Sequence, residues 1–119
     1  MIERVPPQNI EAEQAVIGGM LIEKEAISKV AEFLKADDFY REAHRLIFEA
    51  MLELFNKNEA VDLVTVTEVL RKNDKLEAVG GIAYITSLAN SVPTAANINY
   101  HGKIVEEKAL LRGLINSAT

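Results

Sequence analysis

The sequence has no cysteine, and this absence excludes disulfides, thiolate nucleophiles and zinc–thiolate sites. It also has no apolar run near the ~18 residues that a membrane-spanning helix requires. The first residues lack the basic and then apolar blocks of a signal peptide. We therefore expect a cytoplasmic protein that has no contact with a membrane.

Positive charge and aromatic side chains are both scarce. Thirteen Lys and Arg stand against eighteen Asp and Glu, which gives a net charge of −5, and the basic residues form no block. Nucleic acids are bound by Lys and Arg that displace counterions, and single strands are also bound by stacking on aromatic rings. The chain has four Phe, three Tyr and no Trp. The composition therefore predicts little or no direct nucleic-acid binding by this chain.

The motifs of common catalytic sites are absent as well. There is no Gly-x-x-x-x-Gly-Lys-Ser/Thr loop for nucleotide phosphates and no Gly-x-Gly-x-x-Gly. The two histidines, His44 and His101, have no second His or acid at ligand spacing, so His44 is expected to be either a satisfied or a solvated surface residue. We predict no catalytic residue, no metal site and no cofactor site in the chain.

The sequence does contain helical periodicity. Its 119 residues are enough for one domain, and 49% of them are apolar. Apolar side chains recur at spacings of three and four, which is typical of helices packed in a bundle. Residues 61–67 are rich in β-branched side chains and could form a strand, but Asp62 as a cap favours a helix. Helices are predicted from Asn9, over 23–34, from a cap at Asp37 or Asp38 to Phe55, over 63–73 and over 82–90.

Two features indicate how these helices pack. The third predicted helix has the clearest apolar stripe, and we interpret it as the central post of the bundle. Gly18 and Gly19 lower the helix propensity of the first predicted helix. We interpret this glycine pair as a point where another helix approaches closely.

The last predicted helix begins after a cap at Thr94 and runs to Thr119 without a Gly or Pro that would end it. A helix of about 25 residues is ~37 Å long, which is longer than a small domain is wide. Its outer apolar residues could be covered by the chain's own bundle or by a second chain, and the length favours a second chain. The side expected to meet another subunit comprises Tyr100, Ile104, Leu111, Leu114 and Ile115.

Six segments then stand in a distinctive order along the chain. They are PPQNIEAEQAVIG at 6–18, DFYREAH at 38–44, VDLVT at 61–65, VGGIAYI at 79–85, VPTAANI at 92–98 and IVEEK at 104–108. Together they resemble the N-terminal domain of the bacterial replicative DNA helicase, the DnaB family. The resemblance covers essentially the whole chain.

The resemblance implies an all-α fold in two parts, a globule of about five helices over residues 1–93 and the first arm of a helical hairpin over 94–119. It implies a parent protein that is a hexameric DNA helicase, whose ATP and Mg²⁺ are used by a later domain absent from this chain. In the family, hairpins pair and three pairs form a collar, on which primase docks. The expected partners are therefore primase and further copies of the chain, as a dimer or a trimer of dimers.

By the same resemblance, Glu11, Tyr84 and Ile115 are the positions expected to contact primase. Taken alone, Glu11 could be only an acid favoured by the helix dipole. Tyr84 could be partly buried with its hydroxyl in water, or an aromatic anchor in a partner site. The alternative interpretation of the whole chain is the helicase-interaction domain of a bacterial primase, which has a similar helical architecture.

Overall fold

The structure is a computed structural model that describes residues 5–117, and over that range it is all-helical, as the sequence predicts. No helix in the described range is both long and apolar enough to cross a bilayer. The last two residues of the predicted 94–119 arm lie outside the described residues. The elements are α1 (Ile10–Ile22), α2 (Ala26–Ala31), the 3₁₀ turn η1 (Ala36–Asp38), α3 (Glu42–Asn56), α4 (Leu63–Lys72), α5 (Gly81–Ser91) and α6 (Ile98–Ser117).

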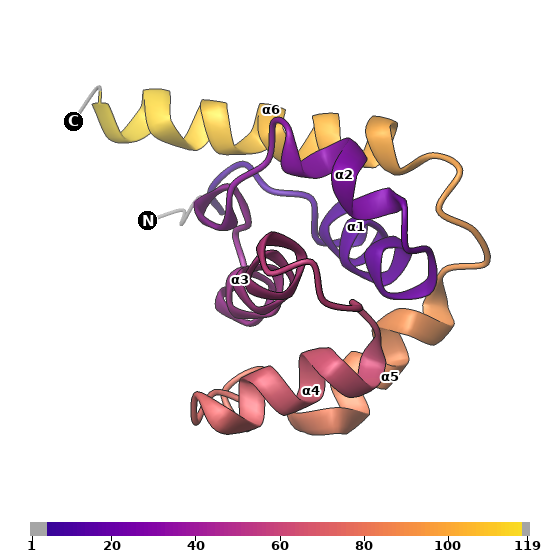
Figure 1. Cartoon of the computed structure of the whole chain (residues 1–119). Helices are drawn as coiled ribbons and strands as arrows, with labels where there is room; N and C mark the ends of the chain where they lie inside the picture. Colours follow the sequence, from indigo (N-terminus) through magenta and orange to yellow (C-terminus); the bar gives the residue numbers. More distant parts are fainter. Residues whose placement is uncertain (1–4, 118–119) are drawn as a thin grey trace.

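The central helix of the fold is α1. The prediction that the third helix, α3, is the central post is therefore wrong. α1 packs against α2, α3, α5 and α6, whereas α3 packs mainly against α4, η1 and α1. Figure 1 shows α6 along one edge of the molecule, α4 and α5 along the opposite edge, and α1 between them. Val16, Ile17 and Met20 of α1 are completely buried. The stripe of α3 was easier to see in the sequence because α3 is buried on one face, while α1 is buried almost all round.

The glycine pair of α1 lies where two other helices come close, which confirms the interpretation of a close approach. A Cβ atom on Gly18 would lie 2.4 Å from the backbone oxygen of Leu88 in α5. A Cβ atom on Gly19 would lie 3.2 Å from the Cβ atom of Ala95, in the segment that leads into α6. These two glycines therefore allow α1 to contact its neighbours on two sides at once.

The chain between α2 and α3 differs from the prediction. Asp37 and Asp38 belong to η1 and do not cap α3, which begins four residues later at Glu42. The Asp38 carboxylate instead accepts the backbone N–H of Lys35 at 2.9 Å. The intervening extended residues bury Phe39 against Phe48 of α3, with ring centroids 4.9 Å apart. Burial of this aromatic pair explains why the helix starts late.

The start of α4 follows the prediction. Asp62 accepts the backbone N–H of Thr65 at 2.9 Å, and the Thr65 hydroxyl oxygen accepts the backbone N–H of Asp62 at the same distance. This reciprocal capping box satisfies two N–H groups that a helix start would otherwise leave without partners. The segment is therefore a helix and not a strand.

The long last helix lies across the globule. Thr94 does not cap it: the Thr94 hydroxyl oxygen accepts the backbone N–H of Ala96 in the preceding turn, and α6 begins at Ile98. The inner side of α6 buries Ile98 and Val105, and it packs against α1, α2 and η1. Near its end, Arg112 donates to the backbone oxygens of Pro7 at 2.8 Å and Asp38 at 2.6 Å. The helix is thus fixed to the globule at both ends, and its outer side faces away.

Candidate functional site

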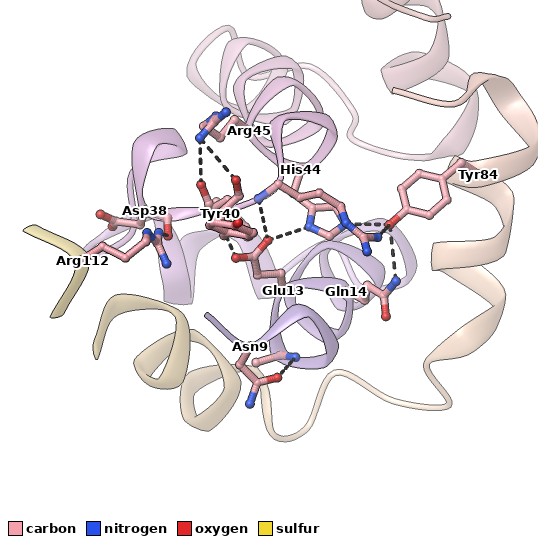
Figure 2. A network of polar contacts seen from close by, with 12 residues as sticks. Asn9, Glu13, Gln14, Asp38, Tyr40, His44, Arg45, Tyr84 and Arg112 are labelled. Carbon is pink, nitrogen blue, oxygen red and sulfur yellow. Dashed lines mark hydrogen bonds and ion pairs between the residues drawn. The ribbon is translucent and has the colours of Figure 1, made fainter. Parts of the chain in front are cut away.

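A buried polar cluster lies where α1, α3 and α5 meet (Figure 2). Glu13 of α1 and His44 of α3 are buried, and the His44 Nδ1 atom lies 2.7 Å from the Glu13 Oε1 atom. The Tyr84 hydroxyl of α5 lies 2.7 Å from the other ring nitrogen of His44. We call these three residues the Glu13–His44–Tyr84 cluster. It joins three helices through side chains that are far apart in the sequence.

His44 is therefore a satisfied histidine, and the alternative of a solvated surface residue is wrong. The sequence showed no acid near it because Glu13 lies 31 positions away along the chain. Of the signals available in the sequence, only the apolar positions around His44 on α3 indicate burial. Folding brings Glu13 of α1 into contact with His44 of α3.

The hydrogen bonds of the cluster have a defined direction. A carboxylate only accepts hydrogen bonds, so the His44 Nδ1–H group donates to Glu13. In the neutral imidazole, Nε2 then accepts from the Tyr84 hydroxyl. The Tyr84 oxygen in turn accepts from Gln14 Nε2 at 3.4 Å and from Arg41 Nη1 at 3.3 Å. The Tyr84 hydroxyl is thus held by three side chains of this protein.

Backbone groups complete the surroundings of the Glu13 carboxylate. The N–H of Tyr40 donates to Oε2 at 2.6 Å, and the N–H of Arg41 donates to Oε1 at 3.3 Å. Across residues 5–117, no buried side-chain nitrogen or oxygen lacks a hydrogen-bond partner. Each polar group of the cluster is therefore used to hold the fold, and the cluster's effect on the surface is to fix the position of Tyr84.

The structure shows what the Tyr84 side chain presents. The ring is half-buried and stacks on the ring of His44, with centroids 5.9 Å apart and planes 15° from parallel. Partial burial agrees with one of the two interpretations of Tyr84, and the structure adds that its hydroxyl is hydrogen-bonded to His44. A partly exposed aromatic ring in a fixed orientation remains, which is the form of residue that serves as an interface anchor.

The other two residues expected to contact primase lie near the same end of α1. Glu11 is exposed in the first turn of α1, which Asn9 caps by accepting the backbone N–H of Ala12 at 2.9 Å. Ile115 of α6 is 53% exposed and lines a pocket next to the prolines that precede α1. Tyr84 is linked to Gln14, one turn after Glu11. Within residues 5–117, no hydrogen bond joins the three directly.

The outer side of α6 carries the residues expected to meet another subunit. Tyr100, Leu111, Leu114 and Ile115 are all exposed, and Leu114 is 60% exposed. Ile104 is only partly buried and packs against the chain's own core, so less of its surface is available. Leu110, at 65% exposed, is a further apolar residue of this surface that the sequence analysis missed. It lies one turn before Leu114, and that spacing was the signal that could have found it.

In the described part of the chain, no three His, Cys, Asp or Glu side chains gather as a metal would need. The polar groups that do gather, in the Glu13–His44–Tyr84 cluster, bond to one another and to the backbone. The geometry is therefore that of a rigid helical body with an apolar outer helix and a fixed tyrosine, which is suited to binding other proteins.

Comparisons with known proteins agree with this arrangement. Residues 5–107 match the family described as DnaB-like helicase N terminal domain. The chain is 58% identical over 117 residues to the replicative DNA helicase DnaC of Bacillus subtilis and 52% identical over 117 residues to the replicative DNA helicase DnaB of Geobacillus stearothermophilus. Each match covers 98% of this chain and 26% of the relative, so the chain spans about a quarter of their length.

Two solved structures have the same fold. The crystal structure of the N-terminal domain of DnaB helicase from Mycobacterium tuberculosis superposes with a TM-score of 0.93 at 46% identity, covering 96% of this chain and 79% of that one. A structure described as a DnaB-like replicative helicase and its interactions with primase superposes with a TM-score of 0.80 at 34% identity, covering 92% of this chain and 25% of that one.

Proposed function

Because the chain belongs to the DnaB-like helicase N-terminal domain family, we propose that it is a non-catalytic assembly and docking domain of a hexameric, ATP-dependent replicative DNA helicase. It supports formation of the helicase ring through a collar and recruits primase to the replication fork. The observation that carries this proposal is the uncovered apolar side of α6 on a chain whose relatives are replicative helicases.

For assembly, we assign α6 as the first arm of a helical hairpin that pairs with the same helix of another subunit. Leu110, Leu111, Leu114 and Ile115 are exposed within two turns of one another. Leu110 and Leu114 border a pocket of about 410 Å³ that also includes Phe33. Apolar side chains in such number are typical of a face that another protein covers. A pair of chains, and three such pairs in the ring, would cover it.

For docking, we assign the contact with primase to Glu11, Tyr84 and Ile115. The support is the similarity to a helicase whose structure is described together with its interactions with primase. A side chain that is already fixed loses little conformational entropy when a partner binds, and the hydrogen bonds to Tyr84 fix it in this way.

The ATP and Mg²⁺ of a replicative helicase would be bound outside this chain. The sequence has no phosphate-binding loop, and residues 5–117 gather no set of metal ligands, so the residues present do not fit either group. No chemical step is therefore assigned to this domain. The alternative of a primase domain is disfavoured, because the curated relatives that cover 98% of the chain are helicases.

The docking proposal is tested by calorimetric titration of this protein with the C-terminal region of primase. We expect Tyr84→Ala to lower the affinity about tenfold or more, as truncation of an interface anchor does. The matched control is Phe55→Ala, since Phe55 is a similarly exposed aromatic residue at the far end of α3. Thermal unfolding of both variants separates loss of contact from loss of fold. Equal heats for the wild type and Tyr84→Ala would contradict the assignment of Tyr84.

A further inference from the structure

A second pocket, distinct from the Glu13–His44–Tyr84 cluster, opens on the surface beside the end of α6. It has a volume of about 320 Å³. The residues that meet there come from the prolines before α1, the extended residues before α3, the first turn of α3 and the last turns of α6. We call it the Tyr40 pocket, and its lining residues are Pro6, Pro7, Tyr40, Arg45, Arg112, Ile115 and Asn116.

The two arginines of the Tyr40 pocket are held in place by backbone oxygens. Arg112 donates to Pro7 at 2.8 Å and to Asp38 at 2.6 Å. The Nη1 atom of Arg45 donates to the backbone oxygens of Phe39 and Tyr40, each at 3.4 Å. The Arg112 guanidinium also lies over the Tyr40 ring, 5.5 Å from its centroid. Figure 2 shows Arg45 and Arg112 both near Tyr40.

Neither guanidinium has an ion-pair partner among residues 5–117. Of these described residues, no Asp or Glu lines the Tyr40 pocket. The Asp38 carboxylate accepts the backbone N–H of Lys35 and forms no ion pair with Arg112. A guanidinium has five N–H donors, and neither arginine forms more than two hydrogen bonds with residues 5–117. Oriented donors therefore remain for an anion.

This arrangement is unexpected in a chain with a net charge of −5. Eighteen acidic residues are present, yet none of those within residues 5–117 lines the Tyr40 pocket, which both arginines do. Charged groups that are partly buried are normally paired, because desolvation of an unpaired charge is costly. Two oriented guanidinium groups that have no ion-pair partner in the described part of the chain thus have the electrostatic character of a binding site for an external anion.

We propose that the Tyr40 pocket binds a side-chain carboxylate of the primase segment that docks on this domain, and this inference rests on the proposed function. The planar fork of Arg matches a carboxylate with two parallel hydrogen bonds. Pro6, Pro7 and Ile115 form apolar walls, so the segment carries an Asp or Glu next to an apolar residue. The pocket shares Ile115 with the proposed primase contact.

A phosphate of single-stranded DNA is the competing anion, and the structure favours the carboxylate. A nucleic acid strand needs a track of basic residues along its backbone. The Tyr40 pocket is a single site with apolar walls on a chain whose overall charge repels a polyanion. The carboxylate therefore fits the pocket better in both shape and charge.

The experiment is a calorimetric titration of Arg45→Gln, Arg112→Gln and the wild type with the C-terminal region of primase, between about 50 and 200 mM NaCl. We expect each variant to lower the affinity about tenfold, as loss of a hydrogen bond to a charged group does. The variants should also weaken less with salt than the wild type. The control is Lys103→Gln, which removes the same charge from an exposed position of α6 that pairs with Glu106.

A charge exchange identifies the partner group. Each Asp and Glu of the primase region is replaced in turn by Arg, and each variant is titrated against Arg45→Glu. We expect one combination to restore binding that both single variants lose. Since Arg112 also fastens α6, thermal unfolding is measured for every variant. If Arg112→Gln does not fold, the test relies on Arg45→Gln. That variant should fold, because it removes only two long hydrogen bonds, each of 3.4 Å.

The outcomes separate this inference from the proposed function. If the wild type does not bind primase, both are overturned. If Tyr84→Ala loses binding while both arginine variants bind like the wild type, only the inference is overturned. If oligo(dT) binds the wild type and the arginine variants abolish that binding, the anion is a phosphate and the carboxylate assignment is wrong.

Discussion

Glu13 is the residue on which three parts of the fold depend. Its carboxylate is buried and accepts hydrogen bonds from the His44 ring and from the backbone N–H groups of Tyr40 and Arg41. A buried polar group that loses its partner carries the full cost of its desolvation. Removal of the Glu13 carboxylate would leave three donors without an acceptor and would release Tyr84 indirectly through His44.

We predict that Glu13→Ala lowers the free energy of unfolding by about 3 kcal/mol or more, because it leaves three buried or partly buried hydrogen-bond donors without an acceptor. Glu11→Ala is the matched control, since Glu11 is an exposed acid in the same turn of α1 and contributes less than about 1 kcal/mol through the helix dipole. Urea denaturation of the two variants is the measurement. Equal losses would show that the Glu13–His44–Tyr84 cluster does not stabilise the fold.

For single residues, the sequence predicted the helix in which each lies better than the residues that each contacts. The helical pattern identified the acids in the first turn of α1 and placed His44 within a helix. It could not reveal that Glu13 and His44 meet, since their 31-residue separation carries no periodic signal. Phe48 lies on the buried face of α3, one turn after His44, but its contact with Phe39 of the extended segment could not be predicted from spacing.

At the scale of elements, two helices of this protein pack closely where the residue at the contact has no Cβ atom. Glycines of this chain therefore differ in whether they tolerate a side chain. Gly18 faces the backbone of α5, where an added Cβ atom would meet the backbone oxygen of Leu88 at 2.4 Å. Gly113 of α6 is also a helical glycine, but a Cβ atom added there would have nothing within 4 Å. The two glycines thus provide an internal comparison between a packed and an open site.

We predict that Gly18→Ala destabilises the protein by roughly 2–3 kcal/mol, because the backbone of α5 must shift to make room. Gly113→Ala should instead stabilise it by about 0.5–1 kcal/mol through helix propensity. Thermal and urea unfolding of both variants check the opposite signs. Should Gly18→Ala prove neutral, the close approach of α1 and α5 would be wrong.

The sequence predicted the six α-helices that residues 5–117 form, but it missed the 3₁₀ turn η1 and misplaced some boundaries. Asp62 begins α4 as predicted, since its partner Thr65 lies only three residues away. The start of α3 was misplaced because Asp38 uses its carboxylate in η1. Local hydrogen bonds are readable from spacing, whereas the extended residues before α3 are held by a contact to Glu13 in another helix.

At the scale of the whole molecule, the governing feature is that α6 is attached on one side only. The molecule extends over 44 × 29 × 25 Å, and α6 lies along one edge of it (Figure 1). Ile98 and Val105 face the globule and are buried, while Leu110 and Leu114 face outward. The sequence predicted that α6 has one side on the globule and another side for a second chain. The reason is that a small globule can cover one apolar stripe of a helix but not two opposite stripes.

The central claim is that other copies of the chain cover the outer side of α6, and the mass of the protein in solution tests it most directly. Light scattering behind a sizing column is recorded over a range of concentrations up to several hundred micromolar for the wild type, Leu114→Asp and Val64→Asp. Val64 is the control, since it is 71% exposed but lies on α4.

We predict that the mass of the wild type and of Val64→Asp rises with concentration toward twice 13.2 kDa. Leu114→Asp should remain at the mass of one chain, because a carboxylate placed in an apolar contact must be desolvated. A wild type that stays at 13.2 kDa throughout, or a Leu114→Asp variant that associates like the wild type, would contradict the claim.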